Sequence, residues 1–498
     1  MVTSVLSCQL RGLEGRLVEV QVHAGAGHGF FMVGLADASV REARERVKSA
    51  ISNSGLTFPG NKVTVSLAPA ELRKEGSGFD LPIAVAIALG QLDSPPSTAG
   101  CAFLGELSLD GAVRHVDGVL VAARWLAANG VRELYVATED ADEAALAEGL
   151  LVRPSRDLVS VVNHLRGDLE LVHHSSPALT APEPAIAEDL AEVHGQAGAR
   201  RALEVAAAGG HHLLLSGPPG AGKTMLARCL PALLPPLNLE SALEVAQVGS
   251  VLGELGGEPL RWTRPFRAPH HSISTAGLIG GGAGVGRPGE ISRAHEGVLF
   301  LDELALFQPG ALQALRQPLE SGRVTITRSG GTVAYPARFM LVAATNPCPC
   351  GWLGDSLRAC RCSATSLASY QRSLSGPLLD RVDLRVDVGR APLTALANEP
   401  AGEGSATVRE RVAAARAVQF ERQGMLNAAL RARDLRAYAA LGASRATLER
   451  WAAERGLTAR GFHRSWRVAR TLADLEGAGQ ICEHHVLEAL GYRLDAAA

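Results

Sequence analysis

Lysine is scarce in this sequence of 498 residues. It stands at four positions only, Lys48, Lys62, Lys74 and Lys223, and arginine supplies the other long basic side chains. A compact ammonium and a planar guanidinium are not interchangeable where a loop folds around a phosphate. The one lysine beyond position 74 is therefore expected to have a specific role, and it lies in a glycine-rich stretch.

Long apolar runs are also missing. The best candidate, residues 81–89, is shorter than the roughly 18 residues that cross a bilayer. The first ten residues lack the basic segment of a secretory signal. We therefore expect a cytoplasmic protein without membrane association. Because the net charge is only -2, any nucleic-acid contact must come from a local basic patch.

The composition, 47% hydrophobic and 20% charged, is that of a globular protein, and the length suggests roughly three domains. Alternating strand and helix patterns predict an α/β domain over residues 1–165, followed by a proline-containing linker at 166–187. A second α/β domain is expected at 188–389, and residues 390–498 show helical patterns only. The clearest elements are strands at 17–22 and 62–67 and helices at 40–51 and 119–129.

A phosphate-binding loop is the strongest motif. It follows an apolar strand, precedes a helix, and fits G-x-x-x-x-G-K-[ST] with Gly217, Pro218, Pro219, Gly220, Ala221, Gly222, Lys223 and Thr224. Glycines let backbone N–H groups turn onto phosphate oxygens, and the helix N-terminus adds positive potential. We expect Lys223 to reach the β- and γ-phosphates of ATP and Thr224 to ligate Mg²⁺. The run at 280–284 lacks a following Lys-Thr and is interpreted as a flexible loop.

Two acidic residues end the apolar segment 297–303, which has the pattern of a buried parallel strand. Ligands bind at the carboxyl ends of such strands. Asp302 is therefore expected to hold Mg²⁺, and Glu303 to orient and activate the attacking water. A further apolar strand at 339–344 leads to Asn346, which can hold that water from the other side; the alternative is a turn-forming Asn before Pro347.

Arginines follow in two places. Arg381, in the string Gly-Pro-Leu-Leu-Asp-Arg, is a candidate to reach the γ-phosphate of a neighbouring subunit. Arg460, Arg464 and Arg467 recur at helical spacing, and residues 409–470 hold 14 arginines against 5 acidic residues. This imbalance favours a phosphate or nucleic-acid face, the alternative being a solvated surface.

Four of the eight cysteines crowd into a short segment, as Cys348, Cys350, Cys360 and Cys362. Four thiolates are a common zinc ligand set, although the usual spacing is C-x₂-C rather than C-x-C. The insertion between the pairs is too short to form its own core, and a metal would order it. Zn²⁺ binding is the expectation, with reduced, unliganded thiols as the alternative.

The order of these motifs resembles AAA+ ATPases of the helix-2-insert group. The strings at 264–271, 287–292 and 346–351 narrow the resemblance to the magnesium chelatase-like family, in its competence-protein (ComM/YifB) branch. The resemblance implies an ATP site formed by the residues named above, with Arg381 as a finger acting in trans and Arg467 as the lid sensor, Arg460 being the other candidate. It also implies that the hairpin at 323–338 and the helix-2 insert face the pore of a homo-hexamer.

The front domain resembles the Lon protease domain over residues 67–82. Lon-type proteases use a Ser–Lys pair. Aligned on Lys74, the nucleophile falls at Gly78 and the partner lysine at Leu120. Because a serine is not activated without an amine base, a non-proteolytic domain used for assembly or DNA contact is expected.

The favoured function is an ATP-driven hexameric DNA motor. The resemblance implies that such a motor promotes branch migration in homologous recombination during natural transformation; single-stranded or branched DNA is the expected partner, and recombination proteins are candidate further partners. The rivals are a chelatase-type ATPase that remodels a protein partner, an ATP-dependent protease, and a DNA-binding conformational switch without strand displacement.

Overall fold

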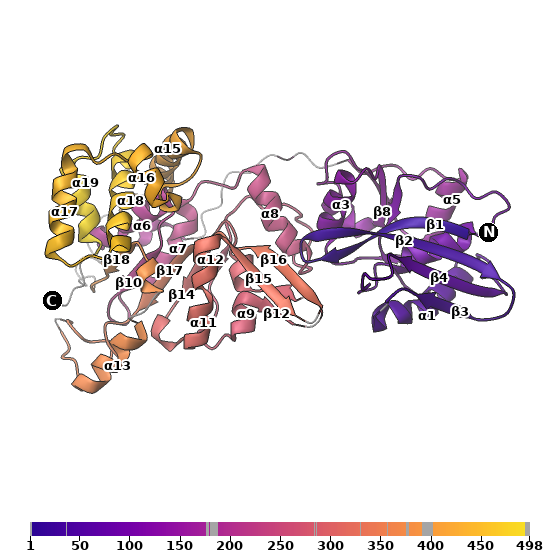
Figure 1. Ribbon diagram of the computed structural model, residues 1–498, viewed down its shortest axis with the longest axis horizontal. Coiled ribbons are helices and arrows are strands. Elements are labelled where there is room, and N and C mark those ends of the chain that lie inside the picture. The colour runs from indigo at the N-terminus through magenta and orange to yellow at the C-terminus, as the bar shows by residue number, and fades with distance from the viewer. Residues whose placement is uncertain are drawn as a thin grey trace.

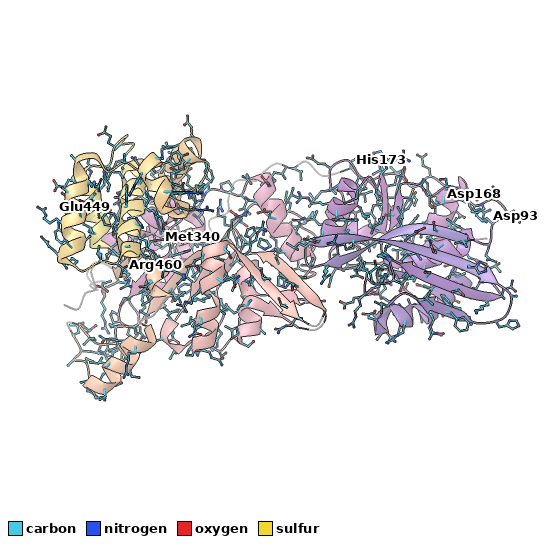
Figure 2. All side chains as sticks on the ribbon, in the orientation of Figure 1. Asp93, Asp168, His173, Met340, Glu449 and Arg460 are labelled. Atoms are coloured by element: carbon cyan, nitrogen blue, oxygen red, sulfur yellow. The ribbon has the colours of Figure 1, made fainter. Side chains whose placement is uncertain are left out.

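The computed structural model describes the chain except for residues 1, 36, 176–178, 180–187, 283, 285, 329, 356, 375–377, 391–401 and 494–498. Most of the expected linker, part of the glycine run, Ser329 in the hairpin turn, and the Gly-Pro before Leu378 thus lie outside the described residues. The molecule is elongated, with the front lobe at one end and the C-terminal helices at the other (Figure 1). In Figure 2, Asp93 and Asp168 mark the first end, and Glu449 and Arg460 mark the second.

The front lobe is built on a seven-stranded mixed sheet in the order β3-β4-β2-β1-β5-β8-β9. Its strands are β1 (Val2–Arg11), β2 (Glu14–Gly25), β3 (Phe30–Val33), β4 (Lys62–Ala68), β5 (Cys101–Phe103), β8 (Glu133–Ala137) and β9 (Leu151–Ser155), and β6 (Glu106–Leu107) pairs separately with β7 (Val113–Arg114). Its helices are α1 (Ala38–Asn53), α2 (Asp80–Leu89), α3 (Val119–Ala128), α4 (Ala141–Ala144) and α5 (Leu158–Arg166).

Apolar periodicity explains these elements. Alternate residues of β4, namely Val63, Val65 and Leu67, are fully buried, as a period of two requires. Helix α1 begins where the Asp37 carboxylate accepts the N–H of Val40, a standard N-terminal cap. Helix α2 is apolar on every side because it lies wholly inside the lobe.

The central unit holds a five-stranded sheet of parallel pairs in the order β11-β14-β17-β10-β18. These strands are β10 (Leu213–Ser216), β11 (Phe266–Arg267), β14 (Val298–Leu301), β17 (Met340–Thr345) and β18 (Leu384–Asp387). The helices around them are α6 (Ala197–Gly209), α7 (Lys223–Leu233), α8 (Leu239–Ser250), α9 (Thr275–Ile279), α10 (Glu290–Arg293), α11 (Pro309–Ala314), α12 (Arg316–Ser321) and α13 (Ala364–Leu374). The α/β fold class with an AAA+ P-loop core is confirmed.

Two small hairpins lie side by side on this unit. The expected hairpin is confirmed as β15 (Arg323–Arg328) paired with β16 (Gly331–Pro336). Against it lies β12 (Gly280–Gly281), paired with β13 (Arg287–Pro288). A Cβ on Gly280 would sit 2.6 Å from Ile326 Cδ1, so only glycine allows this approach. The interpretation of the glycine run as a flexible loop was therefore wrong at Gly280 and Gly281, which are held in a strand pair.

Beyond residue 401 the described chain is helical: α15 (Ser405–Gln423), α16 (Ala432–Tyr438), α17 (Arg445–Glu454), α18 (Ala459–Leu475) and α19 (Glu483–Gly491). These helices share one apolar core with α6, α7 and one face of the central sheet. The expectation of a phosphate-facing arginine row on α18 was wrong in part. Arg460 is exposed, but Arg464 is buried and donates to the Val382 carbonyl, and Arg467 is partly buried.

The front lobe contacts the central unit at two places. Helix α3 packs on α8, where Leu120 and Ala246 are buried together and the Ser250 hydroxyl donates to Glu143 at 2.6 Å. At the second place, the guanidinium of Arg11 donates to the Gly330 carbonyl at the tip of the β15–β16 hairpin, 3.4 Å away. Among the described residues, no helix is both long and apolar enough to cross a membrane.

Candidate nucleotide site

The phosphate loop joins β10 to α7 in a conformation that depends on glycine. Gly220 and Gly222 have φ angles of 77° and 89°, in the left-handed region where side chains are strained. A Cβ on Gly217 would lie 2.1 Å from the carbonyl oxygen of Val388, so the loop can pass β18 only as glycine. The N-terminus of α7 therefore faces the space that the loop encloses, as anion binding requires.

Lys223 is buried within this loop. Its Nζ donates to the carbonyls of Gly217 at 2.6 Å and Pro218 at 3.0 Å, and to Asn346 Oδ1 at 3.1 Å. Burial lowers the pKa of Lys223, an effect that the nearby carboxylates of Asp302 and Glu303 oppose. The ammonium is thus held by neutral oxygens that phosphate oxygens can replace.

Two carboxylates follow β14. Asp302 Oδ2 accepts a hydrogen bond from the Thr224 hydroxyl at 2.8 Å, so the two expected magnesium ligands are adjacent. Glu303 adopts a left-handed backbone, φ 52°, which is unusual for a residue with a side chain. Its side chain is about half exposed, at 52%. The strained turn points to a functional reason for holding this carboxylate where it is.

Asn346 directly follows β17, the strand between β14 and β10, and so meets Lys223 and the two carboxylates at the same edge of the sheet. Its carbonyl accepts the hydroxyl of Tyr370 from α13 at 2.9 Å, and that hydroxyl also lies 3.1 Å from Thr345 Oγ1. The structure thus brings together Lys223, Thr224, Asp302 and Asn346, which are distant in the sequence.

His271 was missed by the sequence reasoning as a member of this site. Its Nδ1 lies 3.5 Å from Glu303 Oε2, and its ring contacts Phe307 edge-on. The residue stands four positions after β11, the edge strand next to β14. The string that contains His271 is a family signature, and β11 has only two residues, so no strand pattern in the sequence points to this position.

Arg381 lies in the 3₁₀ helix η4 (Leu379–Arg381) and forms an ion pair with Glu320 of α12. The guanidinium is 11% exposed. It borders an open cavity of about 450 Å³ whose other lining residues are Gln313, Arg316, Gln317, Glu320 and Ser321. The pair therefore holds a cation at a hollow of the surface, separate from the loop that surrounds Lys223.

The lid arginines differ from one another. Arg464 donates to the Val382 carbonyl at 3.1 Å and lies 3.7 Å from Asp383, so it joins α18 to the start of β18. Arg467 is partly buried, and its desolvation lowers the pKa of its guanidinium against the attraction of Asp383. Within the described part of the chain its Nε has no hydrogen-bond partner. Of the two sensor candidates, Arg467 is partly buried and Arg460 is exposed.

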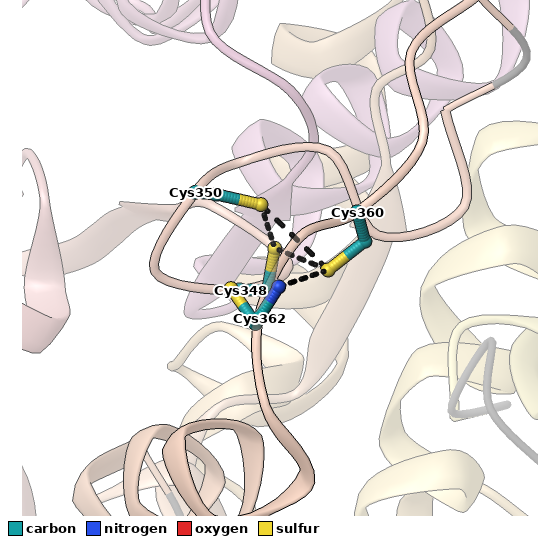
Figure 3. A group of neighbouring side chains, drawn as sticks. All are labelled: Cys348, Cys350, Cys360 and Cys362. Carbon is teal, nitrogen blue, oxygen red and sulfur yellow. Dashed lines mark hydrogen bonds between the residues drawn. The ribbon is translucent and has the colours of Figure 1, made fainter.

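The four crowded cysteines come together directly after Asn346 (Figure 3). Cys348 Sγ lies 3.4 Å from Cys350 Sγ and 3.7 Å from Cys360 Sγ, and the four sulfur atoms are all within 4.8 Å of one another. Backbone N–H groups lower the pKa of the Cys350 thiol to about 6, which favours a thiolate. The donor set fits a soft divalent metal ion.

Taken with the sheet order, a phosphate loop, paired acids and Asn346 at the carboxyl edge define the AAA+ class of P-loop proteins. Three family models match the chain. Their descriptions are "Subunit ChlI of Mg-chelatase" for residues 18–140, "Magnesium chelatase, subunit ChlI" for 189–396, and "Magnesium chelatase, subunit ChlI C-terminal" for 402–493. The chain belongs to the magnesium chelatase-like family of AAA+ proteins, in the branch that includes ComM and YifB.

Three relatives are similar to this chain along almost their whole length. A protein of Mycobacterium tuberculosis strain H37Rv is 45% identical over 495 residues, covering 98% of this chain and 97% of its own. The competence protein ComM of Haemophilus influenzae is 43% identical over 495 residues, covering 97% and 95%. YifB of Escherichia coli K12 is 42% identical over 492 residues, with the same coverage.

Proposed function

We propose that the protein is an ATP-driven hexameric motor that moves strands of branched DNA, promoting branch migration in homologous recombination during natural transformation. The main observation that supports DNA binding is the exposed basic face of the β15–β16 hairpin. The similarity to the competence protein ComM of Haemophilus influenzae supports the cellular setting.

Each residue of the nucleotide site has a chemical task in this proposal. Lys223 and the loop amides bind the phosphates of ATP, and Glu303 takes the proton of the attacking water while Asn346 orients it. Thr224 and Asp302 would hold Mg²⁺, which neutralises charge on the β- and γ-phosphates. Arg467 would sense the nucleotide from the lid.

Arg381 is proposed to act on the nucleotide of a neighbouring subunit. Its place at an open surface cavity supports this, because an exposed γ-phosphate could reach it there. Glu320 would release the guanidinium when a stronger phosphate anion arrives. A site completed in this way requires a ring, which is why a homo-hexamer is part of the proposal.

The β15–β16 hairpin supports DNA binding through its two faces. Val324, Ile326, Val333 and Tyr335 are buried, whereas Arg323 and Arg328 are exposed together with threonine hydroxyls. Tyr335 donates to the Gly286 carbonyl at 2.8 Å and so holds the neighbouring hairpin, whose Arg287 is 69% exposed. Arginine and hydroxyl groups on a narrow edge suit contacts to phosphates that do not read base sequence.

The front lobe is proposed to be a non-proteolytic assembly domain. The position of the missing nucleophile, Gly78, leaves little room for a side chain, since a Cβ there would lie 3.0 Å from Leu104. Leu120, which stands where an active lysine would be, is fully buried against α8.

We also propose that Cys348, Cys350, Cys360 and Cys362 hold one Zn²⁺ per chain.

The test compares ATP hydrolysis with strand movement on a four-way DNA junction. We expect DNA to stimulate the ATPase, raised salt to abolish the stimulation, and the junction to be resolved only with ATP. Arg328→Ala should keep basal hydrolysis but lose roughly tenfold or more of the strand movement. Arg445→Ala, which removes an equally exposed guanidinium from α17, is the matched control and should behave as wild type.

The rival functions give different results. A chelatase-type remodelling ATPase shows neither DNA stimulation nor junction processing, and a conformational switch shows stimulation without processing. A wild-type hexamer that hydrolyses ATP but displaces no strand from any branched substrate would rule out the motor.

A further inference from the structure

The sulfur geometry matches a tetrahedral metal centre. With zinc–sulfur bonds of about 2.3 Å, sulfur atoms of a tetrahedral site lie roughly 3.8 Å apart. The separations of 3.4, 3.7 and 3.6 Å among Cys348, Cys350 and Cys360 are near this value, and Cys362 completes the set (Figure 3). All four thiols are free, because a disulfide would bring two sulfurs to about 2.05 Å.

Polar contacts around Asp355, rather than an apolar core, order the segment that carries these cysteines. Between the pairs, Leu353 and Leu357 are exposed rather than packed. Trp352 is covered by the guanidinium groups of Arg358 and Arg390, at 4.8 and 4.7 Å from its ring centre. A loop of this length without an apolar core folds stably when a metal joins its ends.

One side of this segment touches the phosphate loop. Gly351 has a φ of 83°, and a Cβ built there would lie 2.6 Å from Pro219 Cδ and 2.8 Å from Pro219 Cγ. The backbone of the cysteine segment therefore rests on the ring of Pro219. The same Cβ position is 4.0 Å from Asn346 Cγ, so Gly351 lies between the phosphate loop and the proposed sensor.

The other end of the segment returns to the same place. After Cys362 the chain forms α13, and Tyr370 on that helix donates to the Asn346 carbonyl at 2.9 Å. Asn346 is thus fixed from both directions, by the chain that leads into Cys348 and by the helix that follows Cys362. Its Oδ1 accepts from Lys223, so its position affects the catalytic site directly.

We infer that a zinc ion on the four cysteines makes residues 348–362 a brace, which holds Asn346 and the phosphate loop in the geometry that hydrolysis needs. The inference deepens the proposed function and rests on it for the ATPase activity. The cysteines are positioning residues here, because they act through Asn346 and Pro219. Metal removal should therefore reduce turnover of ATP more than binding of ATP.

The test begins with protein prepared under anaerobic, reducing conditions without added metal. Elemental analysis should find about one zinc per chain, and no iron. Cys360→Ser combined with Cys362→Ser should lose the zinc and lower kcat roughly tenfold or more, while affinity for a fluorescent ATP analogue changes less than about threefold. Cys482→Ser, a change of an exposed cysteine elsewhere, should alter neither property.

A second variant separates the brace from general folding. Gly351→Ala keeps all four ligands but pushes against Pro219, so it should retain zinc and still lose kcat. Wild-type protein that is purified in this way without any metal, and that hydrolyses ATP at the normal rate, would overturn the zinc site. Zinc-loaded Gly351→Ala and zinc-free serine variants that all hydrolyse ATP normally would overturn the brace. Zinc-loaded wild type without any ATPase would refute the proposed function and, with it, the brace, but not the metal site.

Discussion

Lys223 is held before any nucleotide binds. Its ammonium already has three oxygen partners, two of them carbonyls of its own loop and the third on Asn346. A phosphate has only to replace partners of the same kind, so little reorganisation is needed when ATP enters. Glu303 differs, because its carboxylate is half exposed and lies 3.5 Å from Nδ1 of His271.

This contrast predicts different defects in two variants. Glu303→Gln should lower kcat by more than about a hundredfold and leave ATP binding intact, because it removes the base but not the phosphate contacts. Lys223→Ala should weaken ATP binding by roughly 1.5–3 kcal/mol and abolish turnover as well. Equilibrium binding of labelled ATP and steady-state hydrolysis measure the two effects. Normal turnover by Glu303→Gln would show that another group activates the water.

The sequence allowed most of this site to be predicted, and the reason is local. The phosphate loop, the acids after β14 and Asn346 each follow an apolar strand, and parallel strands bring their carboxyl ends together. His271 could not be placed in the same way, because β11 has only two residues and gives almost no periodic signal. The contact between Gly351 and Pro219 depends on loop geometry that no pattern encodes.

Among the elements, helix α18 shows that an excess of basic residues in the sequence does not predict an exposed basic surface. An excess of arginine predicted an exposed basic face. Instead, Arg464 lies beside Asp383, Arg470 pairs with Asp474, and both donate to backbone carbonyls inside the protein. The number of charges in a segment does not reveal which of them pair with residues far away in the chain. Hairpin β15–β16 was predictable because its pattern of alternation and its glycine turn are contained in fourteen consecutive residues, 323–336.

The junction between the central sheet and α18 should be sensitive to acid. Burial lowers the pKa of His212 to about 4, and its Nδ1 accepts the N–H of Leu341 at 3.0 Å, which requires a neutral ring. Unfolding frees this histidine to bind a proton below its usual pKa of about 6.5. The stability that the neutral ring contributes is therefore complete above pH 6.5 and is lost as the pH falls toward 4.

Thermal unfolding between pH 7 and pH 4.5 checks this prediction. The melting temperature of wild type should fall across this range, and His212→Asn, whose amide oxygen can still accept from Leu341, should flatten the dependence. His484→Asn, at an exposed position on α19, is the control. The pKa of Asp383 is held well below its usual range by His211, His212 and Arg464 despite burial, so the stability that it contributes is complete above about pH 4 and is lost only at lower pH. Identical pH profiles for wild type and His212→Asn would contradict the assignment.

At the scale of the whole molecule, the proposed ring can be tested by mixing subunits. Arg381→Ala inactivates the ATP site of the neighbouring subunit, whereas Lys223→Ala inactivates the ATP site of its own subunit. A mixed ring therefore contains some complete sites, and an equal mixture should recover about a quarter of wild-type hydrolysis if subunits assort at random. Two inactive variants that stay inactive in every mixture would argue that Arg381 does not act across a subunit boundary.

The two contacts of the front lobe differ in kind. The α3–α8 contact buries Leu120 and Ala246 and adds the Ser250–Glu143 hydrogen bond. At the hairpin, Leu13 packs on the apolar cluster that includes Val333, and Arg11 donates to the Gly330 carbonyl. A movement of the β15–β16 hairpin must therefore also shift the turn between β1 and β2, so the hairpin and the front lobe are mechanically coupled.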